Sequence, residues 1–518
     1  MKQRFRLKEH VNELIFVVYL SLVWFAYLFV HEVHSGPDAR KQLMVVLCVS
    51  ALLTGILVLV VPGLFRVLRQ WRLLHTPDEV KMRTRLFWFL LGGVMSYAVL
   101  QIWFSICSPG AFSKDSLDQL QEVVTGQYSD WHPAWHTLLF FTLPMKLTGS
   151  RASIVLFQMI WFALAMGLLT SLAYELGGVR AALLSWGVIM LNPYTGFIMM
   201  HPWKDVAFGI ASMVAVILAV RLYCLHEASR FSLVFLGISL ANATIFRHNG
   251  ILLSGVLLLA VFFVLSKKQW ALVFISFALL FAAVKGPVYS FLKVEKPDQR
   301  VVETVGLPMN VIGNVVTQNP EAMDEELQEF VYAIAPQEVW DAAYKTGNYN
   351  SFKWYHADNS VVERAGAQRV LQMMFKCFRL APLESAQGLF ALTDLVYAVE
   401  GEAEDGLWIM GPDEGRALIR IYENFFVSTI FRYLRYIGLT LAALLALILA
   451  RCRLNSRQDW KKILLCLSVF CYDFGTMLLL TGPDYRVFFV SFLVFPPLVL
   501  LMLYQKEPSA NEWIGDHK

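Results

Sequence analysis

Residues 43–65 read LMVVLCVSALLTGILVLVVPGLF, a run of 23 positions without a charged side chain. A helix that crosses a bilayer needs about 20 predominantly apolar residues, because its backbone polar groups must all be bonded within the helix. This stretch therefore predicts a membrane-spanning helix. The same character extends along the 518 residues, of which 57% are hydrophobic and 16% charged. That composition excludes a soluble multidomain protein and a nucleic-acid-binding domain.

About thirteen apolar segments are long enough, or nearly so, to be spans, and we expect an all-α polytopic membrane protein with about 12–13 transmembrane helices. The segments are 13–31, 43–65, 86–106, 133–148, 152–174, 181–200, 204–223, 231–247, 250–266, 270–290, 427–450, 460–481 and 485–504.

The distribution of Lys and Arg predicts the sidedness of these spans. Basic residues gather in 2–8, 66–85 and 451–462, and such loops stay in the cytoplasm. Two polar regions are acidic instead. Residues 107–132 hold one cation against four acids, and residues 292–425 hold 21 acidic and 11 basic residues. Both acidic regions are expected outside, with the N-terminus inside.

With this sidedness, the chain must cross the membrane an even number of times between residues 133 and 200. Three apolar segments lie in this range. One segment therefore does not cross fully. The first candidate is 181–200, which Asn192-Pro193 interrupts, since the residue before a proline resists the helical conformation. The second is the short segment 133–148, which contains Pro144.

The predicted organisation has five parts. They are two extra N-terminal spans with a basic cytoplasmic loop (1–85), a transmembrane core (86–291) whose first outer loop is 107–132, a mainly helical outer domain (292–425), three C-terminal spans (426–506) and a cytoplasmic tail (507–518).

The first outer loop contains a short amphipathic helix. Ser116 and Gln119 fit the S-x-x-Q pattern that opens a helix, and Gly126 suits its end. Asp115 stands where the turn meets this helix. Its carboxylate either stabilises the helix through its interaction with the helix dipole or acts as a general base at the membrane surface. His132 precedes Pro133, which begins the next apolar segment.

Several ionisable residues fall at the outer ends of the predicted spans, where each costs roughly 2.5–3.5 kcal/mol to insert. They are Lys204, Asp205, Arg247, Lys285, Arg432, Arg435, Asp473 and Arg486. A single cation there can simply extend to the interface. Together they predict a polar cavity whose excess of cations suits a phosphate or diphosphate, with Asp473 and Lys285 as structural partners.

The ordered motifs resemble the GT-C class of integral membrane glycosyltransferases, in particular bacterial ones. The resemblance rests on Pro109-Gly110, Ser113, Asp115-Ser116 and Gln119, then His132-Pro133, Trp203-Lys204-Asp205, Arg247 to Gly250, and Tyr485-Arg486. Such enzymes take a sugar from a polyprenyl-phosphate carrier on the outer face of the membrane. The resemblance implies that Asp115 is the catalytic base and that Arg247 and Arg486 bind the lipid phosphate.

We therefore expect a glycosyltransferase in a bacterial inner membrane, with its active site facing the periplasm. It would move a sugar from undecaprenyl phosphate to a cell-envelope glycan such as O-antigen. The candidate catalytic residues are Asp115, Asp205 and His132, and the candidate donor phosphate-binding residues are Lys204, Arg247, Arg486, Arg432 and Arg435. Neither outer region carries a D-x-D pair, so a divalent metal is the less favoured alternative and no other cofactor is expected. The alternatives are a flippase of lipid-linked glycans and a GT-C-like polymerase or ligase with diphosphate-linked donors.

Overall fold

A computed structural model describes residues 2–34, 36–71, 80–296, 301–398, 430–452 and 456–504, and the predictions for 399–429 and for the tail 507–518 lie outside these ranges. Within them the chain is helical, with isolated β-bridges and no strand, so the all-α prediction is confirmed.

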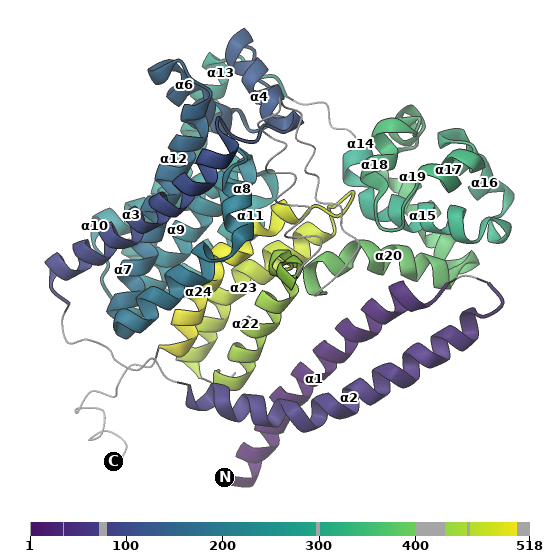
Figure 1. Ribbon diagram of the computed structural model, residues 1–518, viewed down its shortest axis with the longest axis horizontal. Helices are drawn as coiled ribbons and strands as arrows, with labels where there is room; N and C mark the ends of the chain where they lie inside the picture. The colour runs from purple at the N-terminus through teal and green to yellow at the C-terminus, as the bar shows by residue number, and fades with distance from the viewer. Residues whose placement is uncertain are drawn as a thin grey trace.

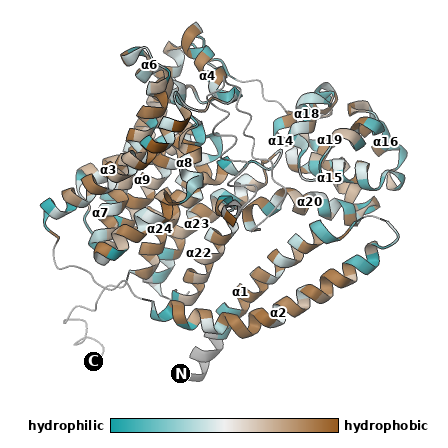
Figure 2. Cartoon of the chain, viewed as in Figure 1, coloured by the Kyte–Doolittle hydropathy of each residue, from teal (hydrophilic) through white to brown (hydrophobic). Residues whose placement is uncertain are grey.

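Seven of the described helical stretches are long and apolar enough to cross a membrane, and three shorter helices are also apolar (Figure 2). The seven are His10–Glu32, Ala39–Gln70, Met82–Cys107, Ala152–Met190, Lys204–Leu225, Lys267–Phe291 and Tyr485–Leu503. Many of their apolar side chains are exposed; that of Leu59, in the stretch Ala39–Gln70, is 81% exposed. An apolar surface of this extent is stable in a bilayer and aggregates in water. The chain is thus a multi-pass membrane protein, and the finer count of 12–13 spans stays a prediction.

The N-terminal hairpin and the transmembrane core account for the helices up to residue 291 (Figure 1). They are α1 (Lys2–Glu32), α2 (Ala39–Gln70), α3 (Met82–Cys107), α4 (Lys114–Thr125), α5 (Ala134–His136), the π-helix η1 (Thr137–Thr142), α6 (Leu143–Thr148), α7 (Ala152–Met190), α8 (Pro193–Met199), α9 (Lys204–Leu225), α10 (Arg230–Phe246), η2 (His248–Gly250), α11 (Ile251–Val264), α12 (Lys267–Ala283), η3 (Val284–Val288) and α13 (Tyr289–Phe291).

The outer domain and the C-terminal helices follow. The domain comprises α14 (Val301–Thr304), α15 (Gly306–Gln318), η4 (Pro320–Ala322), α16 (Glu325–Ile334), α17 (Gln337–Ala343), α18 (Tyr349–Tyr355), α19 (Asn359–Leu380) and α20 (Pro382–Tyr397), and the last elements are η6 (Ile430–Arg435), α22 (Gly438–Arg451), α23 (Arg457–Met477), η7 (Tyr485–Phe488) and α24 (Phe489–Leu503).

The path of α7 decides which segment fails to cross. Its first half runs antiparallel to α3, because Val155 packs on Gly110 just beyond the end of α3 while Tyr174 stacks on Trp88 near its start. Segment 133–148 therefore begins and ends at the same end of the bundle, where Figure 1 places α4 and α6. This segment, the second candidate, therefore does not run the length of the bundle.

The preferred candidate, 181–200, was wrong. The chain reverses at Gly177–Gly178, where Gly178 adopts φ 67°, a left-handed conformation that costs glycine little. The second half of α7 and α8 then run back along α3. Trp186 Nε1 donates to Ser96 Oγ at 3.0 Å, and Met200 O accepts from the backbone N–H of Ala111 at 2.9 Å. Asn192 caps α8 and interrupts the crossing without preventing it.

The outer domain has its own core. The indole of Trp340 stacks on Phe352 at 4.0 Å between ring centroids, and both side chains are fully buried. Helix α20 joins this domain to the membrane helices, because Phe390 packs edge-on against Phe29 of α1 and Leu392 lies in the main transmembrane core. The domain is therefore packed on the bundle along α20 (Figure 1).

Candidate functional site

Asp115 lies in the first turn of α4, at the end of the bundle where α3 finishes. The helix begins at Lys114, with Ser113 as the extended residue before it, and ends at Gly126. The prediction that Ser116 and Gln119 cap this helix was wrong, because the helix already begins at Lys114 and both side chains are buried. Starting the helix earlier places the Asp115 carboxylate near a helix N-terminus, which favours its charged form.

Arg486 connects Asp115 with two other carboxylates. Its Nη1 lies 3.0 Å from Asp115 Oδ2, and its Nε lies 2.8 Å from Asp484 Oδ2 and 3.8 Å from Asp205 Oδ2. The guanidinium also lies 4.7 Å from the ring centre of Trp203, a cation–π contact. A planar group with five donors can make all these contacts together, whereas an ammonium cannot.

Trp203 holds two of the predicted motifs together. Its Nε1 donates to Ser113 Oγ at 2.7 Å, next to Asp115, and its indole stacks on His201 at 4.1 Å. Lys204 and Asp205 follow it in the first turn of α9. The start of α4 and the start of α9 thus lie side by side.

Asp205 is buried, 2% exposed, and forms an ion pair with Arg247. Arg247 follows the end of α10, and its Nε donates to Asn249 Oδ1 at 2.6 Å. Asn249 Nδ2 in turn donates to Thr476 Oγ1 at 2.8 Å. Asp205, the second carboxylate of the site, is therefore paired with Arg247, has Arg486 3.8 Å away, and lies between α9, α10 and α23.

Lys204 differs from the two arginines. Its ammonium interacts electrostatically with Asp115, Arg247, Arg486 and Asp484. Among the residues that the structure describes, no hydrogen bond or ion pair within 4.0 Å engages it. Since Arg486 and Arg247 are both paired with carboxylates, Lys204 is the cation of this group that is best able to accept an anion.

Burial by itself raises the pKa of Asp115, but the positive charges of Arg486 and Lys204 and the hydrogen bond from Arg486 hold this pKa below its ordinary value. His132 shows the reverse. Burial, with the charge of Lys204, lowers its pKa to about 3, so its imidazole is neutral at pH 7. Its Nε2 lies 4.0 Å from Asp118 Oδ2, and it is 3% exposed. His132 therefore lies beside the site as a neutral group.

Three other predicted residues lie apart from these contacts. Lys285 pairs with Asp130 at 2.7 Å, and Asp473 is fully buried and accepts from Ser491 at 2.7 and 2.8 Å. The guanidinium of Arg435 lies over the rings of Tyr436 and Tyr485, at 5.3 and 5.2 Å. The side chain of Arg432 is outside the described part of the chain.

One residue of the site was not identified from the sequence. It is Asp484, whose carboxylate accepts from Arg486 two positions away and which was visible as the acid in TGPDYR. Within the described ranges, no cluster of three or more His, Cys, Asp or Glu residues has the geometry to hold a metal ion.

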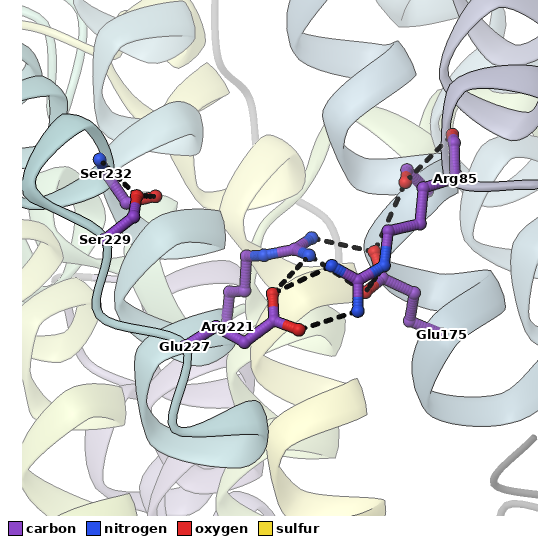
Figure 3. Close-up of polar contacts among 7 residues, drawn as sticks. Arg85, Glu175, Arg221, Glu227, Ser229 and Ser232 are labelled. Atoms are coloured by element: carbon purple, nitrogen blue, oxygen red, sulfur yellow. Dashed lines mark hydrogen bonds and ion pairs between the residues drawn. The ribbon is translucent and has the colours of Figure 1, made fainter. Parts of the chain in front are cut away.

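A charged cluster that was not identified from the sequence lies at the opposite end of the bundle (Figure 3). Glu175 of α7 bonds Arg221 of α9 at 2.7 and 2.9 Å and Arg85 of α3 at 3.1 Å. Glu227 bonds the same two arginines, at 2.6 and 2.9 Å. Glu175 directly follows the apolar run 152–174, which was the signal available. Because each of these charges is paired, the cluster stabilises the packing of α3, α7 and α9 against one another.

The fold and these contacts define a multi-pass α-helical membrane protein with a mixed-charge site at one end of its bundle. Comparison with protein-family models, with curated proteins and with solved structures finds no match.

Proposed function

We propose that this protein is a membrane glycosyltransferase that moves a sugar from a polyprenyl-phosphate donor to a hydroxyl of a cell-envelope glycan. The donor would be undecaprenyl phosphate carrying a hexose, and the site would face the periplasm from a bacterial inner membrane. The observation that supports this most is the contact of Asp115 with Arg486, beside the unpaired ammonium of Lys204.

The cations of the site suit the phosphate of a lipid donor. Lys204 opens α9, a helix of 22 residues, and the N-terminus of a helix attracts anions through its free N–H groups and its dipole. Arg486 can exchange a carboxylate for a phosphate oxygen with little change of geometry. The polyprenyl chain of the donor would lie in the bilayer, beside the apolar helices that adjoin the site.

Asp115 suits the role of base. In the proposed step an acceptor hydroxyl oxygen bonds to the anomeric carbon, the bond from that carbon to the phosphate oxygen breaks, and the hydroxyl proton passes to the Asp115 carboxylate. Polyprenyl phosphate leaves with both electrons of the broken bond, which inverts the carbon. A phosphate bound to Arg486 would weaken the hold of Arg486 on Asp115 and make that carboxylate more basic when the donor is present.

The outer domain supplies a surface for a glycan acceptor. Trp340, Tyr344 and Tyr349 form its core and cannot stack on a sugar. Trp354 and Tyr355 of α18 are 50% and 66% exposed. Exposed aromatic faces beside amide and carboxylate groups suit sugar binding, so we assign the acceptor to this side of the molecule.

The test uses purified protein in nanodiscs with a radiolabelled polyprenyl-phosphate hexose and an envelope glycan acceptor. Asp115→Asn is expected to keep donor binding and to lose at least about 100-fold in turnover, a size typical of a missing general base. Asp118→Asn is the matched control, because Asp118 lies on the same helix in an exposed pair with Lys114. Equal activity of both variants, or transport of the lipid without transfer, would refute the proposal.

The mass of the envelope glycan with and without the gene identifies the sugar and the acceptor. A mass difference of one hexose is expected. An unchanged glycan would contradict the transferase assignment.

A further inference from the structure

The outer domain contacts the turn that leads into Arg486. This turn, residues 480–484, lies between α23 and η7, and we name it the Thr481 turn. Figure 1 shows α14–α20 beside the C-terminal helices that the turn connects. Arg486 is the second residue of η7, so the position of its backbone follows that of the turn.

Three hydrogen bonds join the domain to Thr481 itself. Thr481 Oγ1 donates to Asn350 Oδ1 at 3.0 Å and accepts from Lys353 Nζ at 3.3 Å. Asn310 Nδ2 donates to Thr481 O at 3.2 Å. Lys353 is 2% exposed and is neutralised by Glu303. A buried lysine of this kind is a fixed donor rather than a mobile surface chain.

Close backbone packing reinforces these bonds. A Cβ added to Gly306 would lie 2.2 Å from Leu480 O, and one added to Gly482 would lie 2.7 Å from Asn350 Cβ. Contacts this short leave no room for a side chain at either glycine. The turn is therefore seated against α15 and α18 on both sides of Thr481.

The Thr481 turn continues directly into the candidate site. Asp484, its last residue, accepts from Arg486 Nε at 2.8 Å, and Arg486 Nη1 reaches Asp115 at 3.0 Å. We infer that the outer domain positions Arg486 through the Thr481 turn, with Asn350 and Lys353 as positioning residues. This inference deepens the proposed function and rests on it for its kinetic consequences.

The physical consequence is that the donor phosphate meets an arginine whose place is set by a domain outside the membrane. A displaced Arg486 would bind the donor phosphate through longer and less well aligned hydrogen bonds, which weaken steeply with distance and angle. Loss of the Thr481 hydroxyl should therefore weaken donor binding more than it slows the chemical step.

The experiment compares Thr481→Val, which keeps the shape and removes the hydroxyl, with Thr481→Ser, which keeps the hydroxyl. The first readout is hydrogen–deuterium exchange of peptides that cover residues 478–490. The second is the KM for the polyprenyl-phosphate hexose against kcat. For Thr481→Val we expect exchange to rise about tenfold and donor KM to rise about tenfold, the size of a lost hydrogen bond to a charged group. We expect kcat to change less than about threefold.

Thr481→Ser is expected to match the natural protein in both readouts. Lys376→Met is the control within the outer domain, because Lys376 pairs with Asp324 and Glu326, away from the turn. It should leave both readouts unchanged. If Thr481→Val still unfolds at the natural temperature but shows unchanged exchange and unchanged donor KM, the inference is wrong.

Asn350→Ala removes the hydrogen-bond acceptor of Thr481 without changing a residue of the Thr481 turn. It should raise exchange and donor KM in the same direction as Thr481→Val, and an unchanged result would count against the inference. If the natural protein transfers no sugar, the proposed function fails, and the exchange measurement still decides whether the domain holds the turn.

Discussion

Replacement of Arg486 by glutamine tests the site most directly. Arg486 contacts Asp115 at 3.0 Å, Asp484 at 2.8 Å and Asp205 at 3.8 Å, and it is the cation with the most carboxylate partners in the site. Arg486→Gln removes one positive charge from the proposed phosphate site. A hydrogen bond to a charged group is worth about 1.5–3 kcal/mol, so donor KM should rise about 10- to 150-fold.

The same substitution should change the pH dependence. In the natural protein the pKa of Asp115 lies below its ordinary value of 3.8, so the carboxylate is ionised throughout the range from pH 5 to 8. Without Arg486, burial dominates and raises that pKa. Activity of Arg486→Gln should then fall as the pH is lowered, because the protonated carboxyl cannot accept a proton, while the natural protein shows no such loss from this group.

The assay is steady-state transfer from a polyprenyl-phosphate hexose in nanodiscs between pH 5 and 8. Arg486→Lys keeps the charge and loses the planar fork, so it should retain the natural pH profile and still show a raised donor KM. Arg369→Gln is the control, since Arg369 forms an exposed pair with Glu326 in the outer domain. An unchanged donor KM and an unchanged pH profile in Arg486→Gln would refute the reasoning.

Three further predictions concern stability. Glu175→Gln should lower the free energy of unfolding by about 1.5–3 kcal/mol because it removes the buried carboxylate from Arg85 and Arg221 and leaves Glu227 as their shared partner, whereas the more exposed Glu227→Gln should cost about 1 kcal/mol, as thermal unfolding in detergent would show. Burial raises the pKa of Glu122 from 4.5 to about 7, so the folded protein should lose stability, up to about 3 kcal/mol, as the pH rises from 4.5 through 7; Glu122→Gln should remove this dependence. Gly196→Ala should cost about 1–3 kcal/mol because its Cβ would lie 2.2 Å from an indole ring, and Gly187→Ala, with its nearest contact at 3.5 Å, should be tolerated.

The sequence predicted the helices well and their courses less well. Apolar segments such as 43–65 and 204–223 lie within helices of the structure, because hydrophobic length is a local property. The course of 133–200 could not be read in the same way. It depends on the reversal of the chain at Gly178 and on the packing of α7 along α3. Pro193 is the interruption that is visible in the sequence, but the chain does not reverse there.

The site shows the same division. The motifs predicted that Asp115, Asp205, Arg247 and Arg486 would lie at one end of the molecule, and the structure joins them by ion pairs. The sequence did not predict which carboxylate pairs with which arginine. Arg435 contacts aromatic rings, although its position in the chain resembles that of the arginines in the site.

The sequence alone determined that this chain is a multi-pass helical membrane protein with charges gathered at the ends of its spans, because hydropathy and charge belong to each residue separately. Only the tertiary structure decided that Arg486 meets Asp115 across 371 positions of chain, and that a domain outside the bundle holds the turn beside it. Contacts between residues so distant arise from the packing of intervening helices, and no local pattern of residues encodes them.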